Sequence, residues 1–255
     1  MALLKFGDLP FDADLVAFDT DGTLVDFEFM WGRLAVAWVE RLVAETGDRG
    51  LARDLYRSMG YDARQQRTKP QSPLAIASTG QLRAIVAGTL YRHGIPWPQA
   101  EDHTRRAFET GESLPLAELI RPTGDVRGLL QRLQGAGVGV AVVTTDHRAE
   151  TEETLQLMGI APLVDHAVCG DDGLLSKPAP DMLLAACQAL GADPARTAVV
   201  GDTVADLEMA RRAGAGFGAA VLTGAGDPVQ LRAQASAVLG SIDEIRVVEQ
   251  AEAWE

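Results

Sequence analysis

The chain has 255 residues, of which 36 are acidic and 23 are basic, and its formal net charge is −13. Because nucleic acid and anionic membrane surfaces repel so acidic a chain, we expect neither as a partner. The 47% hydrophobic and 23% charged residues are typical of a globular protein of one large domain or two unequal domains. The first ten residues lack the apolar centre of a secretory signal, and no apolar run reaches membrane-spanning length. We therefore expect a cytoplasmic protein.

The first predicted element is a strand, and a long helical region follows it. The short apolar run Leu15–Phe18 predicts a buried strand. From about residue 29 to residue 118 the periodicity is helical, and one helical face carries Trp31, Leu34, Trp38 and Leu42. Thr79 is predicted to be the N-cap of a later helix. Between these helices, residues 60–78 are predicted to form a loop rich in Arg, Gln, Lys and Pro.

From Ile120 onward, predicted helices and strands alternate. Strands are predicted at about 138–143, 163–169, 197–200, 217–222 and 237–239, each followed by a helix, the last of them near Asp243. This alternation predicts an α/β fold with a doubly wound parallel sheet that is covered on both faces. The first strand belongs to the same sheet. We therefore expect a core domain, residues 1–28 and 119–255, interrupted by a helical domain, residues 29–118.

The segment Asp19-Thr20-Asp21-Gly22-Thr23 carries the strongest chemical signal. Asp19 and Asp21 are one residue apart where the first strand ends and the chain turns at Gly22, so both carboxylates can address one cleft. Two like charges held so close are costly unless a cation or a shared proton offsets them. The pattern therefore favours a metal-assisted site with a carboxylate nucleophile over a purely structural turn.

Other polar residues follow the later strands, and ligands bind at the carboxyl ends of strands in an open parallel sheet. Thr144 and Thr145 end the second core strand, Lys177 lies in the segment after the third, and Asp202 ends the fourth, with Asp206 four residues further on. Carboxylates, a hydroxyl group and a lysine together suit a hard cation and a dianionic phosphate.

These four segments resemble the four ordered motifs of the haloacid dehalogenase superfamily. They are Phe18–Thr23, Val142–Thr145, Lys177–Pro180 and Val200–Asp206. Within the superfamily, the chain most resembles the phosphoglycolate phosphatase-like members. That resemblance implies a Rossmann-like core with a helical cap inserted after the first strand. Four motifs in order, each at a strand end, are a specific signal.

The resemblance also implies roles for these residues. Asp19 would attack phosphorus to form an aspartyl-phosphate, and Asp21 would serve as general acid and then as general base. The expected cofactor is Mg²⁺, held by Asp19, the main-chain carbonyl of Asp21, and Asp202, with Asp206 bound directly or through water. The substrate phosphate is expected to contact Thr144, Thr145 and Lys177.

The second carboxylate selects a branch of the superfamily. Dehalogenases lack an acid two residues after the nucleophile, so Asp21 favours phosphate transfer. We predict a phosphatase acting on a small phosphorylated metabolite similar to phosphoglycolate, in a monomer or a homodimer. Two alternatives stay open: a sugar phosphomutase on the same core, and a non-catalytic binding domain.

Several residues are left with ordinary structural interpretations. Thr20 stands where an apolar residue is more usual, and we expect its side chain to point away from the nucleophile with little effect on chemistry. Cys169 and Cys187 are expected to be buried thiols. The cluster of Arg64, Arg67 and Lys69 could be a solvated charged surface or a contact for an anionic substrate.

Overall fold

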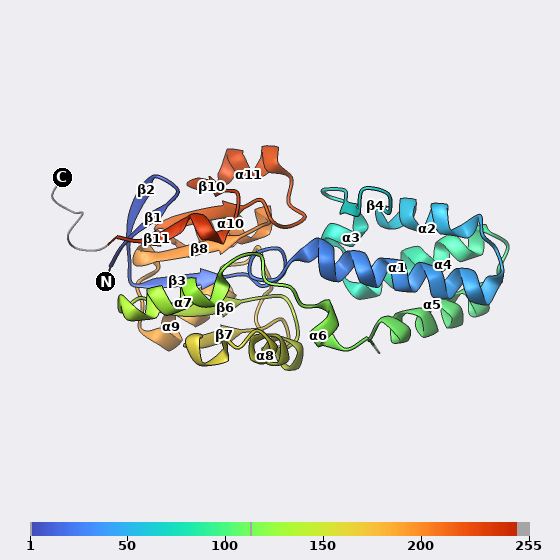
Figure 1. Cartoon of the computed structure of the whole chain (residues 1–255), viewed down its shortest axis with the longest axis horizontal. Helices are drawn as coiled ribbons and strands as arrows, with labels where there is room; N and C mark the ends of the chain where they lie inside the picture. Colours follow the sequence, from blue (N-terminus) through green and yellow to red (C-terminus); the bar gives the residue numbers. More distant parts are fainter. Residues whose placement is uncertain (1, 113, 249–255) are drawn as a thin grey trace. The chain divides into compact units, whose positions relative to one another are not determined.

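The computed structural model describes residues 2–112 and 114–248, with side chains left undescribed at 110–112, and these residues form two compact units. One unit, the sheet unit, runs to Asp26 and resumes at Ile120; the other, the helical unit, is Phe27–Leu119. Figure 1 shows strands in the first unit and mainly helices in the second. Over the described residues, no helix combines the length and the apolar character needed to cross a membrane.

A six-stranded parallel sheet is the centre of the sheet unit, which confirms the predicted fold class. Its strand order is β10-β9-β8-β3-β6-β7. The strands are β3 (Leu15–Phe18), β6 (Gly139–Val143), β7 (His166–Val168), β8 (Thr197–Gly201), β9 (Phe217–Val221) and β10 (Ala237–Leu239). Because β3 pairs with β6 on one side and with β8 on the other, the carboxyl ends of these three strands are neighbours. Strand order reverses there, which is where such sheets bind ligands.

Alternate residues of the central strands pack on opposite faces of the sheet. Val16 and Phe18 of β3 join one apolar cluster, and Leu15 and Ala17 join another. The first cluster includes side chains of α7 (Val126–Gly135), and the second includes those of α9 (Asp181–Leu190) and α10 (Val204–Ala213). The remaining helices of this unit are α8 (Arg148–Leu157) and α11 (Pro228–Gln234). Cys169 and Cys187 are free and buried, as predicted.

This unit also contains a second, antiparallel sheet that the sequence analysis did not predict. It has the order β11-β1-β2 and consists of β1 (Ala2–Phe6), β2 (Leu9–Ala13) and β11 (Ile245–Val247). The predicted helix near Asp243 is therefore wrong: a single 3₁₀ turn, Ile242–Glu244, leads directly into β11. The strand β11 is held by its pairing with β1, in which Leu4 lies opposite Val247. Because these residues are far apart in sequence, local periodicity cannot reveal the pairing.

The helical unit is built around four longer helices and its own apolar core. These are α1 (Phe27–Thr46), α2 (Leu51–Met59), α4 (Thr79–Arg92) and α5 (Trp97–Glu112), with short α3 (Pro73–Ile76) and α6 (Leu116–Leu119). Trp38 lies in that core and stacks on Phe108, with ring centroids 4.1 Å apart. The predicted apolar face of the first helix is thus confirmed as core.

The segment predicted as a loop between α2 and α4 is partly ordered. It contains a small hairpin of β4 (Tyr61–Asp62) and β5 (Arg67–Thr68). Glu28 anchors the hairpin by accepting hydrogen bonds from the backbone N–H and the hydroxyl of Thr68. The N-cap of α4 is Ser78 and not Thr79, because Ser78 forms a reciprocal capping box with Gln81.

Candidate active site

Three carboxylates from two distant segments meet at the carboxyl edge of the sheet. Asp19 follows β3, Asp202 follows β8, and Asp206 lies in the first turn of α10. One carboxylate oxygen from each lies within 4.8 Å of the others. Asp202 and Asp206 are 2% and 1% exposed. Such a buried cluster of like charges needs cations close by.

Lys177 supplies one of those cations. Its ammonium donates hydrogen bonds of 2.6 Å to both Asp19 Oδ1 and Asp206 Oδ1, and its side chain is 4% exposed. Burial lowers the pKa of Lys177, but the carboxylates of Asp19 and Asp206 outweigh burial and raise it above the usual value. The lysine is therefore positively charged at neutral pH. The three carboxylates still outnumber it.

The cluster has an unused oxygen suited to a metal ion. Asp202 Oδ2 accepts a hydrogen bond from the Ala225 backbone N–H at 3.0 Å, whereas Oδ1 is buried and has no partner. Burial raises the pKa of Asp19 to about 7, and it raises the pKa of Asp202 well above its usual value, with a further contribution from neighbouring carboxylates. Carboxylates that are costly to ionise without a counter-charge fit a hard divalent cation.

Asp206 has a different set of contacts from Asp202. Its Oδ2 accepts hydrogen bonds from the backbone N–H and the hydroxyl of Thr203, which form a capping box at the start of α10. Its Oδ1 accepts from Lys177. Both oxygens are therefore engaged, and the geometry makes Asp206 an anchor for the lysine.

Asp21 lies in the turn that follows β3, two residues after Asp19. Its half-buried side chain lies outside the groups of close carboxylates found among the described residues. The Thr20 carbonyl accepts hydrogen bonds from three successive backbone N–H groups, at residues 23–25, which fixes the turn. Gly22 has φ +81°, and a Cβ there would lie 2.6 Å from Asp202 Oδ2. Glycine is thus required both by the turn and by the neighbouring carboxylate.

Two threonines and an aspartate meet at the end of β6. Thr144 is 1% exposed, and its hydroxyl donates to Asp146 Oδ2 at 2.8 Å and lies 2.7 Å from the hydroxyl of Thr20. The Thr20 hydroxyl also donates to Asp146 Oδ2, at 2.8 Å. Thr145 is exposed. The Thr20 side chain, which we expected to point away from the nucleophile, therefore contacts Thr144, the predicted phosphate-binding threonine.

A loop that sequence reasoning missed encloses Asp202. It follows β9 and contains Gly224 and Ala225. A Cβ on Gly224 would lie 1.9 Å from Asp202 Oδ2, so only glycine allows the loop to approach the carboxylate this closely. Thr223 binds the loop to the turn after β3 by donating a 2.5 Å hydrogen bond to the Gly22 carbonyl. The run of small residues 223–226 after a predicted strand was the available signal.

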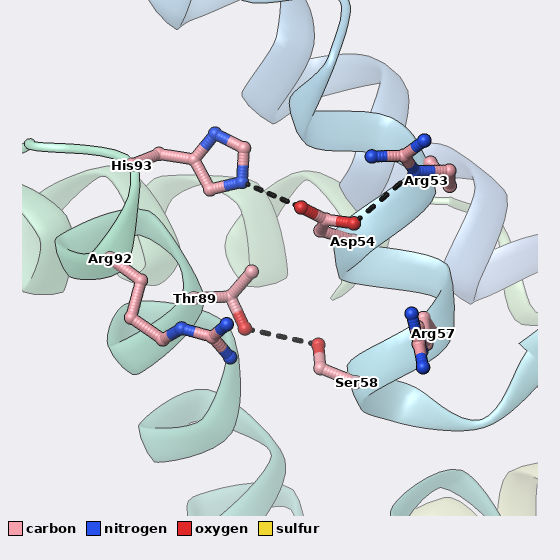
Figure 2. A pocket seen from close by; sticks show the side chains of 7 residues that line it. All are labelled: Arg53, Asp54, Arg57, Ser58, Thr89, Arg92 and His93. Carbon is pink, nitrogen blue, oxygen red and sulfur yellow. Dashed lines mark hydrogen bonds and ion pairs between the residues drawn. The ribbon is translucent and has the colours of Figure 1, made fainter.

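The helical unit contains a separate cavity of about 650 Å³ between α2 and α4 (Figure 2). Its lining is mainly cationic, with Arg53, Arg57, Arg92 and His93 beside Asp54, Ser58 and Thr89. His93 bridges two carboxylates, contacting Asp48 at 2.9 Å and Asp54 at 3.1 Å. These contacts raise the pKa of His93.

Comparison with known proteins identifies the family of this chain. A family model of haloacid dehalogenase-like hydrolases matches residues 13–214. The chain is 35% identical to the N-acetylmuramic acid 6-phosphate phosphatase of Pseudomonas aeruginosa over 53% of its own length and 59% of that relative. It is 33% identical to the "Probable phosphatase IndB" of Dickeya dadantii, over 78% and 77% of the two chains.

The fold also matches solved structures. A crystal structure described as a predicted phosphoglycolate phosphatase from Haemophilus somnus aligns over 90% of this chain and 95% of its own, with a TM-score of 0.65 and 19% identity. The chain therefore belongs to the haloacid dehalogenase-like hydrolases and is phosphoglycolate phosphatase-like among them. Its class, a phosphoric monoester hydrolase, agrees with the sequence prediction.

Proposed function

We propose that this chain is a Mg²⁺-dependent phosphatase that hydrolyses a small phosphate monoester through an aspartyl-phosphate on Asp19. The observation that carries the proposal is the convergence of Asp19, Asp202 and Asp206 with Lys177 at the switch point of the sheet. The buried excess of carboxylates and the orphan Asp202 Oδ1 support a divalent cation at the same place.

Asp19 is the proposed nucleophile. Its Oδ1 accepts a hydrogen bond from Lys177. Within the described residues, Oδ2 accepts no hydrogen bond that would lower its nucleophilicity. In the first step, a carboxylate oxygen of Asp19 bonds to phosphorus while the bond from phosphorus to the leaving oxygen breaks. Lys177 stabilises the negative charge that develops on the phosphoryl oxygens.

Asp21 is the proposed proton carrier. It donates its proton to the departing oxygen in the first step, and the resulting carboxylate then takes a proton from water. That water attacks phosphorus, the bond to Asp19 breaks, and inorganic phosphate leaves with the nucleophile restored. The proposal is supported by the position of Asp21, two residues after Asp19, in a turn held by backbone hydrogen bonds to the Thr20 carbonyl.

Asp19, the Asp21 main-chain carbonyl and Asp202 would hold the magnesium ion, with Asp206 contributing through Lys177. When bound, the ion would neutralise the carboxylates and polarise the phosphoryl group. Asp202 is prepared for this role by Ala225, whose N–H occupies one oxygen and leaves the other available.

The proposed substrate is a small phosphorylated metabolite, with phosphoglycolate first and N-acetylmuramic acid 6-phosphate second. Support comes from the names of relatives: a phosphoglycolate phosphatase of Shigella boydii is 28% identical over 78% of this chain, and the Pseudomonas relative is named for the sugar acid.

A phosphate-release assay over a panel of metabolite phosphates tests this function. We expect turnover of at least one small monoester with Mg²⁺ and its loss with a chelator. Release of one phosphate per substrate consumed separates a phosphatase from a phosphomutase. No release from any member, with the protein shown to be folded, would contradict the proposal.

A further inference from the structure

A closed group of three oxygen atoms lies at the end of β6. Thr20 Oγ1, Thr144 Oγ1 and Asp146 Oδ2 are separated from one another by 2.7–2.8 Å. Thr20 and Thr144 are 2% and 1% exposed, so solvent cannot easily replace any of these contacts. Because the two threonines are 124 residues apart in sequence, the group joins the turn after β3 to the neighbouring strand end.

The three oxygen atoms make three contacts with one another but share only two hydroxyl protons. Both hydroxyls donate to the same carboxylate oxygen, and each hydroxyl has a single proton. The contact between the two hydroxyls therefore has no proton of its own in this arrangement. Thr144 Oγ1 additionally accepts a hydrogen bond from the Asp146 backbone N–H at 3.1 Å, which holds the oxygen in place while its proton can turn.

Asp146 competes with a substrate for the Thr144 proton. A hydroxyl that donates to a carboxylate forms a charge-assisted hydrogen bond, so Asp146 holds a donor more firmly when it has no second donor. Thr20 supplies this second donor. Because the Thr20 hydroxyl donates to Asp146, the carboxylate keeps one hydrogen bond when the Thr144 hydroxyl turns its proton towards a ligand. An apolar residue at position 20 would leave Thr144 as the only hydroxyl donor to Asp146 Oδ2.

We propose that Thr20 is a positioning residue that frees the Thr144 hydroxyl to donate to a phosphoryl oxygen of the ligand. The inference rests on the proposed function, because it assumes that phosphate binds at this end of the sheet. Thr20 acts through Asp146 and Thr144 and need not touch the ligand itself.

Four variants test the proposal: Thr20→Val, Thr20→Ser, Asp146→Asn, and Thr20→Val combined with Asp146→Asn. The readouts are the affinity for inorganic phosphate, measured by calorimetry with Mg²⁺ present, and KM and kcat for the best substrate. Thr20→Val should weaken phosphate binding and raise KM by about tenfold, the value of one charge-assisted hydrogen bond, with kcat little changed. Thr20→Ser keeps the hydroxyl and should bind phosphate as the native chain does.

The double variant separates positioning from simple packing. Replacing the competing carboxylate by a neutral amide should restore most of the phosphate affinity lost in Thr20→Val, a recovery that a packing defect would not show. The proposal is overturned if Thr20→Val binds phosphate as the native chain does, if Thr20→Ser is as impaired as Thr20→Val, or if adding Asp146→Asn to Thr20→Val gives no recovery. Because phosphate binding needs no turnover, a native chain that hydrolyses nothing would contradict the proposed function while this comparison still decides the role of Thr20.

Discussion

The two units of the chain each hold an unbalanced set of charges, and burial gives the two sets different meanings. In the sheet unit, three carboxylates lie close together, and Lys177, whose side chain is 4% exposed, contacts two of them. In the helical unit, three arginines and His93 line a cavity with one carboxylate, but Arg53 is 86% exposed (Figure 2). Water and salt balance the second set at little cost. The first set is largely shielded from both, so the buried imbalance supports the proposed metal ion and the exposed one does not.

The largest expected effect is that of Asp19→Asn. Removing the proposed nucleophile should lower kcat by about four orders of magnitude or more while the fold is retained. The matched control is Asp8→Asn, an exposed residue of the same unit, which should leave kcat unchanged. Steady-state kinetics and circular dichroism measure the two properties. Substantial activity in Asp19→Asn would show that the buried cluster is structural.

Metal binding should depend on pH in the sheet unit. Because the folded-state pKa is raised to about 7 for Asp19 and well above 3.8 for Asp202, the stabilising effect of their protons is present below about pH 4 and is lost as the pH rises through about 7. Mg²⁺ should replace those protons. The rise in Tm caused by Mg²⁺ should therefore be larger at about pH 8 than at about pH 5.5. An equal or larger rise at the lower pH would contradict a cluster that exchanges protons for metal.

Gly224→Ala tests whether the loop after β9 shapes the metal site. The added methyl group would overlap the Asp202 carboxylate, so that side chain must move and Mg²⁺ affinity should fall by about tenfold. Gly135→Ala is the control, because a Cβ at the end of α7 meets nothing within 4 Å. Calorimetric titration with Mg²⁺ compares them. Unchanged Mg²⁺ affinity in Gly224→Ala would show that this loop does not shape the metal site.

The smallest effect is expected in the helical unit, from His93→Gln. The pKa of His93 is raised by Asp48 and Asp54, so its stabilising charge is fully present below about pH 6.5 and is lost as the pH rises through the higher folded-state pKa. The variant should lower the unfolding midpoint at about pH 6 and have no effect at about pH 9. Tryptophan fluorescence is a suitable probe, since Trp31, Trp38 and Trp97 all belong to this unit. Equal destabilisation at both pH values would point to packing alone.

Sequence reasoning predicted the parts of the molecule that depend on local pattern. The strand β3, the later strand ends and the residues Asp19, Lys177 and Asp202 follow from apolar runs and from the rule that parallel strands end at one edge. The four ordered motifs then restricted the candidate families to the haloacid dehalogenase superfamily. These features need no knowledge of side-chain conformation.

The features that escaped prediction depend on long-range contacts. The pairing of β1 with β11 joins opposite ends of the described chain, and neither strand exceeds five residues. The contact between Thr20 and Thr144 needs particular side-chain conformations in two segments that follow neighbouring strands. The approach of Gly224 to Asp202 depends on where a loop returns in space. None of these three contacts produces a periodic pattern of residues in the sequence.

The central claim is that Asp19 becomes phosphorylated at a Mg²⁺ site formed by the buried cluster. Beryllium fluoride forms a stable mimic of an aspartyl-phosphate, and fluorine NMR detects it when bound. The account predicts a bound fluorine signal in the native chain only when Mg²⁺ is present, and no such signal in Asp19→Asn. A bound signal of equal intensity in Asp19→Asn, or one in the native chain without Mg²⁺, would contradict it.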